Sequence, residues 1–355
     1  MKDLASDPWE DLVDLAALSA WMDAHGIGRG ELRIEKRLAG GTQNLLVQLA
    51  RGDERMVLRR PPRHLRPHSN KTMLREARVL GTLAATAVPH PALIAACEDT
   101  AVLGAAFYLM APVDGFNAAA DGLPPLHSAD PALRRRMGLA MVDAIAALGE
   151  LDPSALGLED FGRVDGFLER QVGRWRSQLA DYDQLQGWPG PQSLPGVEAV
   201  GDWLQAHRPP QGAPGILHGD YHIANVMFRH DAGELAAIVD WELSTLGDPL
   251  LDLGNLLAGW PEPQETGTAL RVEPWDGFPS ADELLARYAE RSRRDLQHVH
   301  WYTVLASFKT AVILEGTYAR ACAGLAPKPN GERLHAAALR RMNRALRLVG
   351  HPVPG

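Results

Sequence analysis

The chain has 355 residues, of which 46% are hydrophobic, so it is long enough for one large domain or two lobes and lacks the polar bias of a disordered protein. Its 44 acidic and 36 basic residues give a formal charge of −8, which argues against a general polyanion binder, and we expect no nucleic-acid partner. The two cysteines, Cys97 and Cys322, lie in apolar surroundings and indicate buried thiols in a reducing cytosol.

The sequence predicts neither a signal peptide nor a membrane span. Acidic residues occur throughout the first twenty positions, and proline or polar residues break the apolar runs well short of the roughly 20 residues that a span needs. We therefore expect a soluble, cytoplasmic protein without a membrane partner. The pattern carries no information on the oligomeric state.

The N-terminal part of the chain combines helices with a sheet. A helix is predicted from the Asp7–Pro8 pair to Gly26. Three short runs predict an antiparallel sheet, at residues 31–39, 44–50 and 55–60. Residues 71–85 predict a helix whose apolar stripe also includes Glu76. The run 106–115 begins as a buried strand and then breaks, so we expect a connector between lobes there.

The remainder of the chain is mostly helical in pattern, with one exception at residues 215–241. There, apolar triplets flank polar clusters, and the turn HDAGE predicts a hairpin between VMF and AAIVD. Asn225 precedes this hairpin and Asp240 ends it, so the hairpin itself can bring the two side chains together. Asp220 stands in the loop before it.

These three residues match the needs of phosphoryl transfer. That chemistry uses a carboxylate near the attacking hydroxyl, oxygen ligands for Mg²⁺ and a cation for the phosphates. Each of Asp220, Asn225 and Asp240 alone would be read as a capped turn or a hairpin end. Their order within one loop and hairpin favours a functional site.

Several motifs carry a resemblance to a known family. The residues His218, Asp220, Asn225 and Asp240, with the turn AGGTQN and the helix REARVL, resemble the aminoglycoside phosphotransferase and choline kinase group of small-molecule kinases. More narrowly, MVLRRPP, LHGDYHIANVMF, IVDWELSTLGDPLLDLGNLLAGW and FKTAVILEGTYAR resemble the kinase-like domain that animals fuse to an acyl-CoA dehydrogenase, and its stand-alone bacterial relatives.

This resemblance implies an α+β, protein-kinase-like two-lobed fold with an N-terminal antiparallel sheet lobe and a mainly helical C-terminal lobe. It places a nucleotide-binding lobe at residues 1–111 and a helical lobe with the catalytic loop and substrate site at residues 112–355, with ATP between them. It also implies that Asp220 is the catalytic base or hydroxyl-orienting carboxylate. Asn225 and Asp240 would be the Mg²⁺ ligands.

Two further residues are assigned to the catalytic site, and Asp252 to its support. His218 is expected mainly to hold the loop through hydrogen bonds. Glu242 is expected at the site, although pointing into solvent is the alternative. Asp252 either braces the catalytic loop or is favoured only by the dipole of the helix that Asp248 and Pro249 begin.

A second set is expected to bind the nucleotide: Gly40, Gly41, Asn44, Arg59, Glu76, Met110 and Val113. The two glycines either let backbone N–H groups approach phosphates or form only a hairpin turn. Burying Glu76 would be costly without a cation, and where the kinase pattern offers a strand lysine this chain has Arg59 beside Arg60. Because the two arginines point to opposite faces of a strand, we choose Arg59 as the partner and expect Arg60 to be solvated.

The predicted function is transfer of the γ-phosphoryl group of MgATP to a hydroxyl of a small molecule, with a hydroxyacyl compound or its CoA thioester as the first candidate acceptor. The basic loop from Arg63 to Lys71 either meets an anionic group such as the phosphates of coenzyme A or is simply solvated. The alternative is a kinase-like module that binds nucleotide or an acyl ligand without turnover.

Overall fold

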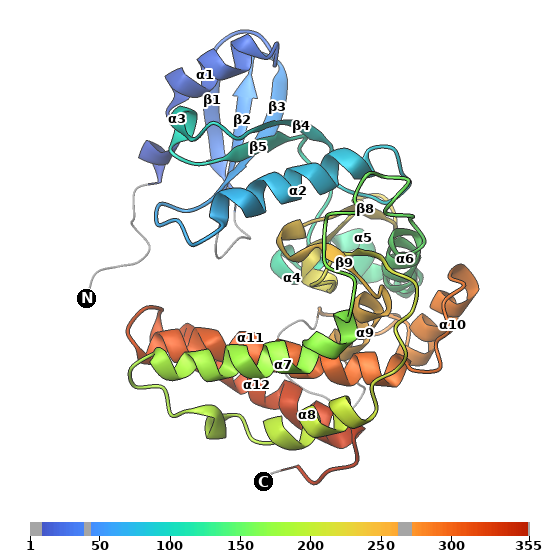
Figure 1. Ribbon diagram of the computed structural model, residues 1–355. Helices are drawn as coiled ribbons and strands as arrows, with labels where there is room; N and C mark the ends of the chain where they lie inside the picture. The colour runs from blue at the N-terminus through green and yellow to red at the C-terminus, as the bar shows by residue number, and fades with distance from the viewer. Residues whose placement is uncertain (1–8, 39–43, 262–271, 354–355) are drawn as a thin grey trace. The chain divides into compact units, whose positions relative to one another are not determined.

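The structure is a computed structural model that describes residues 9–38, 44–261 and 272–353, drawn in Figure 1. The chain divides into two compact units. The first unit comprises Met1–Asp121 and Asn225–Ser244, and the second comprises Gly122–Ala224 and Thr245–Gly355. Each unit is described by itself.

The first unit is built on an antiparallel sheet in the order β1-β2-β3-β5-β4. Its strands are β1 (Leu32–Arg37), β2 (Leu45–Arg51), β3 (Glu54–Arg60), β4 (Leu93–Cys97) and β5 (Phe107–Met110). Its helices are α1 (Leu15–Ala24), α2 (Ser69–Leu83), α3 (Thr100–Leu103) and α4 (Ala118–Asp121). The three predicted strands and the predicted helix α2 are confirmed, whereas β4 was not foreseen.

The start of α1 differs from the prediction. Asp14 caps this helix, because its carboxylate accepts hydrogen bonds from the backbone N–H groups of Ala16 and Ala17. A separate 3₁₀ turn, Glu10–Leu12, precedes it. The predicted start at Asp7 and Pro8 lies outside the described residues.

The predicted hairpin is present as β7 (Val226–Phe228) and β8 (Leu235–Ile238). It belongs to the first unit because backbone hydrogen bonds join it there: Phe116 and Phe228 exchange two bonds of 2.9 and 2.8 Å, and the Ile238 N–H donates to the Pro89 carbonyl at 2.8 Å. The close approach also requires Gly115, since a Cβ there would lie 2.7 Å from the Phe228 carbonyl oxygen. The compact units therefore do not separate at residue 111; the division into binding lobes at residues 1–111 and 112–355 stays a prediction.

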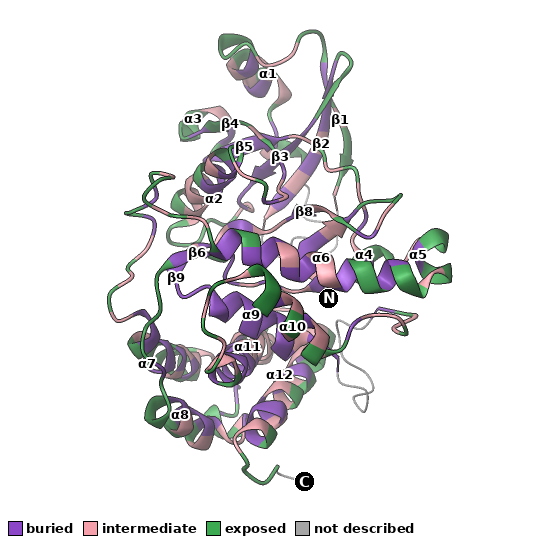
Figure 2. Cartoon of the chain, turned by 90° about the vertical axis from the view of Figure 1, so that its right-hand side faces the viewer, coloured by how far each residue is buried: buried purple, intermediate pink, exposed green. Residues whose placement is uncertain are grey.

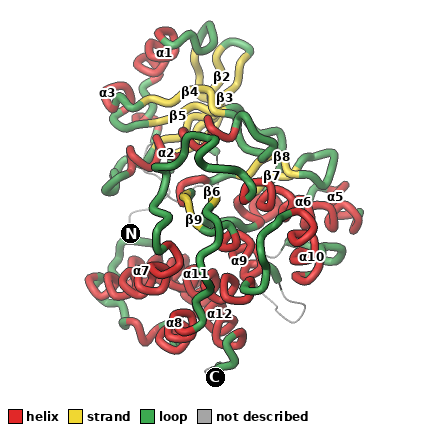
Figure 3. The backbone as a smooth tube through the Cα atoms, turned by 45° about the vertical axis from the view of Figure 1, so that its right-hand side comes forward, coloured by secondary structure: helices red, strands yellow, loops and turns green. Residues whose placement is uncertain are grey.

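The second unit is mainly helical, as predicted. Its helices are α5 (Pro125–Ala129), α6 (Pro131–Gly149), α7 (Phe167–Asp181), α8 (Val197–Ala206), α9 (Leu250–Gly259), α10 (Ala281–Arg291), α11 (Val299–Cys322) and α12 (Lys328–Leu348). A short antiparallel pair, β6 (Gly215–Leu217) and β9 (Thr245–Gly247), lies among them. Figure 3 shows how few strands interrupt the helices of this unit.

Helix α11 is the centre of the second unit. It packs against α7, α8, α9 and α12, and its residues are largely buried in Figure 2. Helix α9, one of its neighbours, is buried along nearly its whole length. This packing gives the loop that follows β6 a rigid support. No helix in the described ranges is both long enough and apolar enough to cross a membrane.

Candidate active site

The first unit contains a buried network centred on Arg59. The Nε atom of Arg59 lies 2.9 Å from Glu76 Oε2, and Nη2 donates a hydrogen bond of 2.7 Å to Asp240 Oδ1. The Tyr108 hydroxyl donates to Glu76 Oε2 at 2.9 Å. The pairing of Arg59 with Glu76 that the helix stripe predicted is therefore present.

Strand register and helix packing together build this network. In the sheet, Arg59 lies opposite Tyr108 of β5, so both side chains can reach the same carboxylate on α2. The Glu76 side chain is 1% exposed, and burial raises its pKa to about 7, although Arg59 and the hydrogen bond from Tyr108 act in the opposite direction. Burial works against the charge of Arg59, but the nearby Glu76 raises the pKa of Arg59, so the guanidinium stays charged.

Arg60 does not behave as predicted. It is 3% exposed, and its guanidinium donates to the Pro61 carbonyl at 3.2 Å and to the Leu12 carbonyl. The expectation of a solvated charge was wrong because the turn before α1 covers this face of the sheet and supplies an acceptor. Because Leu12 and Arg60 are 48 residues apart in the sequence, no local sequence pattern predicts this contact.

Glu242 and Asn44 extend the network toward its exposed side. Asn44 Nδ2 donates to Glu242 Oε2 at 3.1 Å, and the same oxygen lies 3.7 Å from Arg59 Nη2. Glu242 therefore lies with the predicted nucleotide-binding residues, and its catalytic role stays a prediction. Met110 ends β5 as a buried residue and Val113 follows as a half-buried one. Gly40 and Gly41 lie outside the described residues.

The hairpin places Asn225 and Asp240 at the same end, as predicted. The backbone N–H of Val239 donates to the Asn225 carbonyl at 2.9 Å, one residue beyond the paired Val226 and Ile238. Asp240 then adopts a left-handed backbone with φ of 68°, a conformation in which aspartate is enriched. The Asp240 side chain is 32% exposed, whereas Asn225 is buried, so one end of the hairpin combines a half-buried carboxylate with a buried amide side chain.

These two oxygen donors fit Mg²⁺, which usually binds one or two protein groups and takes its other ligands from phosphates and water. Among the residues that the structure describes, no group of three or more His, Cys, Asp or Glu side chains could hold a metal ion.

In the second unit, the loop after β6 is held by its backbone. Asp252 of α9 accepts hydrogen bonds from the N–H groups of His218 and Gly219, at 2.7 and 2.9 Å. Lys309 of α11 donates to the Gly219 carbonyl. The bracing role offered for Asp252 is therefore seen, whereas Lys309 was missed although it lies within a family-like motif. A lysine within the largely apolar run from Val304 to Leu314 was the available signal.

The electrostatics of this loop keep Asp220 ionised. His222 Nε2 lies 3.4 Å from Asp220 Oδ2, and the Asp220 N–H donates to His218 Nδ1 at 3.3 Å. Burial alone would raise the pKa of Asp220, but His222, Lys309 and His218 together lower it well below the ordinary range. His218 is fully buried, which agrees with its expected part in holding the loop.

Comparison with known proteins decides the family. Residues 35–299 match the phosphotransferase enzyme family. The chain belongs to this family. A solved structure of a candidate aminoglycoside phosphotransferase from Ralstonia eutropha is 30% identical, with a TM-score of 0.76 over 94% of this chain and 98% of that one. The predicted protein-kinase-like fold and the prediction of a small-molecule phosphotransferase are confirmed.

The chain is also similar to two other kinds of known protein. Human acyl-CoA dehydrogenase family member 11 is 30% identical over 329 residues, which are 90% of this phosphotransferase and 41% of the human protein. The chain spans between 29% and 41% of the length of the first curated relatives that it matches. A mutant of aminoglycoside phosphotransferase APH(4)-Ia, solved with ADP and hygromycin B, is 16% identical with a TM-score of 0.58 over 94% of this chain and 99% of that one, and shows the fold alone.

In the second unit of the phosphotransferase, Asp220 lines a cavity of about 430 Å³. The other lining residues are His222 and residues of helices α9, α11 and α12. They form an apolar part (Ala258, Ile313, Leu314, Leu334 and Ala337) and a basic part (Arg333, Arg340, Arg341, Arg344 and Arg347). The volume is within the range of small-molecule sites.

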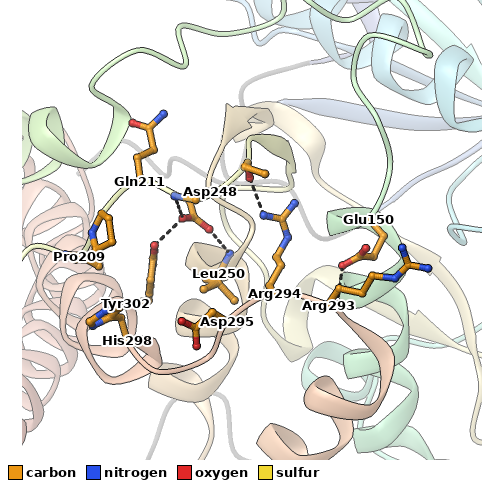
Figure 4. Close-up of a pocket in the computed structure, with 13 residues that line it drawn as sticks. Glu150, Pro209, Gln211, Asp248, Leu250, Arg293, Arg294, Asp295, His298 and Tyr302 are labelled. Carbon is orange, nitrogen blue, oxygen red and sulfur yellow. Dashed lines mark hydrogen bonds between the residues drawn. The ribbon is translucent and has the colours of Figure 1, made fainter.

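A second cavity of about 410 Å³ in the same unit contains none of the predicted site residues (Figure 4). Asp248 accepts hydrogen bonds there from the Tyr302 hydroxyl at 2.6 Å and from the Leu250 N–H at 3.1 Å. The helix begins at Leu250, with Pro249 rather than Asp248 as its N-cap residue, but the Asp248 side chain still accepts a hydrogen bond from the first backbone N–H of α9. These contacts anchor the helix that carries Asp252.

Proposed function

We propose that this phosphotransferase moves the γ-phosphoryl group of MgATP to a hydroxyl of a small molecule. The observation that carries the proposal is Asp220, an ionised carboxylate on a loop fixed by Asp252 and Lys309, which lines a cavity of small-molecule size. A carboxylate so placed can orient an acceptor hydroxyl. Phosphoryl transfer depends mainly on such positioning and on charge stabilisation.

The nucleotide is assigned to the residues of the first unit. Asn225 and Asp240 would hold Mg²⁺, which supplies neutralising charge to the phosphates when bound. Arg59 would contact the phosphates, and its planar fork can serve a carboxylate and a phosphate at once. Gly40, Gly41, Asn44, Glu76, Met110 and Val113 complete the proposed nucleotide-binding set.

In the proposed reaction, the oxygen of the acceptor hydroxyl forms a bond to the γ-phosphorus. The bond from that phosphorus to the oxygen bridging to the β-phosphate breaks, and ADP leaves with the electron pair. The hydroxyl proton passes to Asp220 or to water. Because the pKa of Asp220 is held below its ordinary range, the carboxylate serves first to orient the hydroxyl and accepts the proton only as the new bond forms.

A hydroxyacyl compound, free or as its CoA thioester, is the first candidate acceptor. Its support is the likeness over most of this chain to acyl-CoA dehydrogenase family member 11. An aminoglycoside is the other candidate, named by the description of the Ralstonia eutropha structure. The replacement of the usual strand lysine by Arg59 favours a different proposal, a nucleotide-binding module without turnover.

The test is a screen of hydroxylated metabolites for acceptor-dependent release of ADP from MgATP. Asp220→Asn keeps the shape of the side chain and removes its charge, so it should bind MgATP normally and lose acceptor-dependent turnover by about 100-fold or more. Equal turnover in the parent and the variant would refute the assignment of Asp220. Nucleotide binding without ADP release across the screen would favour the inactive module.

A further inference from the structure

We propose that the acceptor carries an anionic group and that arginines of α12 bind this group in the cavity that Asp220 lines. The inference rests on the proposed phosphoryl transfer and specifies the charge of the acceptor. Under this proposal, Arg340 and Arg347 determine which acceptors are bound. Neither residue was a candidate from the sequence.

The charge of the cavity is the first observation. Among the described residues that line it, five are arginines and Asp220 is the single carboxylate, although the whole chain carries a formal charge of −8. The basic residues follow helical spacing at positions 333, 340, 341, 344 and 347, so they share one face of α12. Scattered surface arginines would not converge on the cavity that also contains the proposed catalytic carboxylate.

The arginines divide into anchored and exposed members. Arg344 is buried and donates to the Trp260 and Leu257 carbonyls at 2.9 and 3.1 Å, and Arg341 donates to the Ala258 carbonyl. These bonds attach α12 to the C-terminal end of α9 and hold the row in place. Arg340 and Arg347 are exposed residues of the cavity lining, where a ligand in the cavity can contact them. An anchored row of this kind is preorganised for an anion.

The apolar part of the lining indicates the chemical nature of the rest of the acceptor. Ala258, Ile313, Leu314 and Leu334 give the cavity an apolar part, which suits an aliphatic chain. The acceptor class is thus a hydroxylated aliphatic compound with a carboxylate or phosphate group. A polycationic acceptor would meet like charges here, which costs binding free energy.

The basic loop from Arg63 to Lys71 is less suited to this task. Arg63 already forms an ion pair with Asp11, with 2.8 Å between Nη1 and Oδ2. Its charge is therefore partly neutralised within the first unit. The cavity arginines lie in the same unit as Asp220, which is why we assign the anion to them.

The experiment compares acceptors that differ only in charge. Hydroxyoctanoates with the hydroxyl at several positions, their CoA thioesters and their methyl esters are tested for ADP release, with kanamycin as a polycation. We expect kcat/KM at least about tenfold higher for the acids or thioesters than for the methyl esters. The acids and thioesters distinguish a carboxylate from a phosphate as the bound group. Equal or better turnover of the methyl esters or kanamycin would overturn the inference.

Variants test the residues themselves. Arg340→Gln and Arg347→Gln should each raise KM for the anionic acceptor about tenfold, leave kcat nearly unchanged and leave the methyl ester unaffected. Arg320→Gln is the matched control, because Arg320 is an exposed arginine of α11 outside the cavity lining. Unchanged KM in both cavity variants would refute the proposal.

Direct binding separates this inference from the proposed reaction. Octanoate and octanoyl-CoA have no hydroxyl to phosphorylate, so calorimetry with them reports anion binding alone. Binding to the parent that weakens in Arg340→Gln but not in Arg320→Gln supports the anion site even if no acceptor releases ADP. Absent binding of both compounds, together with turnover of a neutral acceptor, contradicts the anion site while the phosphotransferase proposal stands.

Discussion

Both units contain a buried cation beside carboxylates, but they hold it in different ways. In the first unit, Arg59 contacts the side-chain carboxylates of Glu76 and Asp240. In the second, Lys309 contacts the backbone carbonyl of Gly219, and Asp252 accepts two backbone N–H groups. The first arrangement is a network of side chains, and the second fixes a piece of main chain.

The pKa directions of the carboxylates agree with this difference. Burial raises the pKa of Glu76 to about 7, whereas nearby cationic and imidazole groups lower the pKa of Asp220 against the effect of burial. A side-chain network that includes the half-buried carboxylates of Asp240 and Glu242 can rearrange when phosphate charge arrives. A braced loop instead keeps one carboxylate ionised and oriented. Under the proposed function, nucleotide binding and catalytic positioning therefore belong to different units.

The largest effect should come from removing the cation of the braced loop. Lys309→Met leaves the Gly219 carbonyl without this donor, so Asp220 should lose its orientation and turnover should fall by about 100-fold. Because nucleotide binding is assigned to the first unit, the affinity for MgATP should stay within about twofold.

Acceptor-dependent ADP release and calorimetry with MgATP measure these two quantities. Asp252→Asn, which keeps the side-chain size, provides a second variant if Lys309→Met does not fold. A loss of MgATP affinity as large as the loss of turnover would break the comparison.

The next effect concerns the side-chain network. Arg59→Ala strands Glu76 in a nearly fully buried position and should lower the free energy of unfolding by about 3–5 kcal/mol, together with the affinity for MgATP. Arg59→Lys should restore part of both, since the charge returns without the planar fork. Thermal melts with and without MgATP report both changes. An unchanged free energy of unfolding in Arg59→Ala would show that the pair of Arg59 and Glu76 does not provide the predicted stabilisation.

A smaller effect is expected from Asp240→Ala. If this carboxylate acts through the metal, affinity for nucleotide should fall about tenfold in the presence of Mg²⁺ and change little in its absence. Titrations of ADP with Mg²⁺ and with EDTA measure the two affinities. Equal losses in both would mean that Asp240 acts through Arg59 rather than through Mg²⁺.

The smallest effect separates the two neighbouring arginines. Arg60→Ala removes hydrogen bonds to two backbone carbonyls and should lower the free energy of unfolding by about 1–2 kcal/mol, with no change in nucleotide affinity. Arg55→Ala, an exposed position on the same strand, is the control. A silent Arg59→Ala with weakened nucleotide binding in Arg60→Ala would show that the wrong arginine was named.

Much of the fold could be predicted because its signals are local. Alternation predicted β1, β2 and β3, helical spacing predicted α2 with Glu76 among its buried residues, and the turn HDAGE predicted the hairpin. The strand β4 was missed because it is short, Ile94 is its single β-branched residue, and its two alanines have little preference for strands. Helix α1 begins later than predicted because Asp14 is an equally good cap within the same acidic stretch.

The sequence by itself determined the order of the catalytic and metal-binding candidates and the need for a cation near Glu76, because these depend on residue types at short spacing. Only the tertiary structure decided that Arg60 is buried, that Lys309 contacts Gly219 and that the α12 arginines share a cavity with Asp220. Each of these contacts joins residues tens of positions apart. Periodicity shows which face of an element is apolar, whereas the partner of that face is selected by the packing of the whole unit.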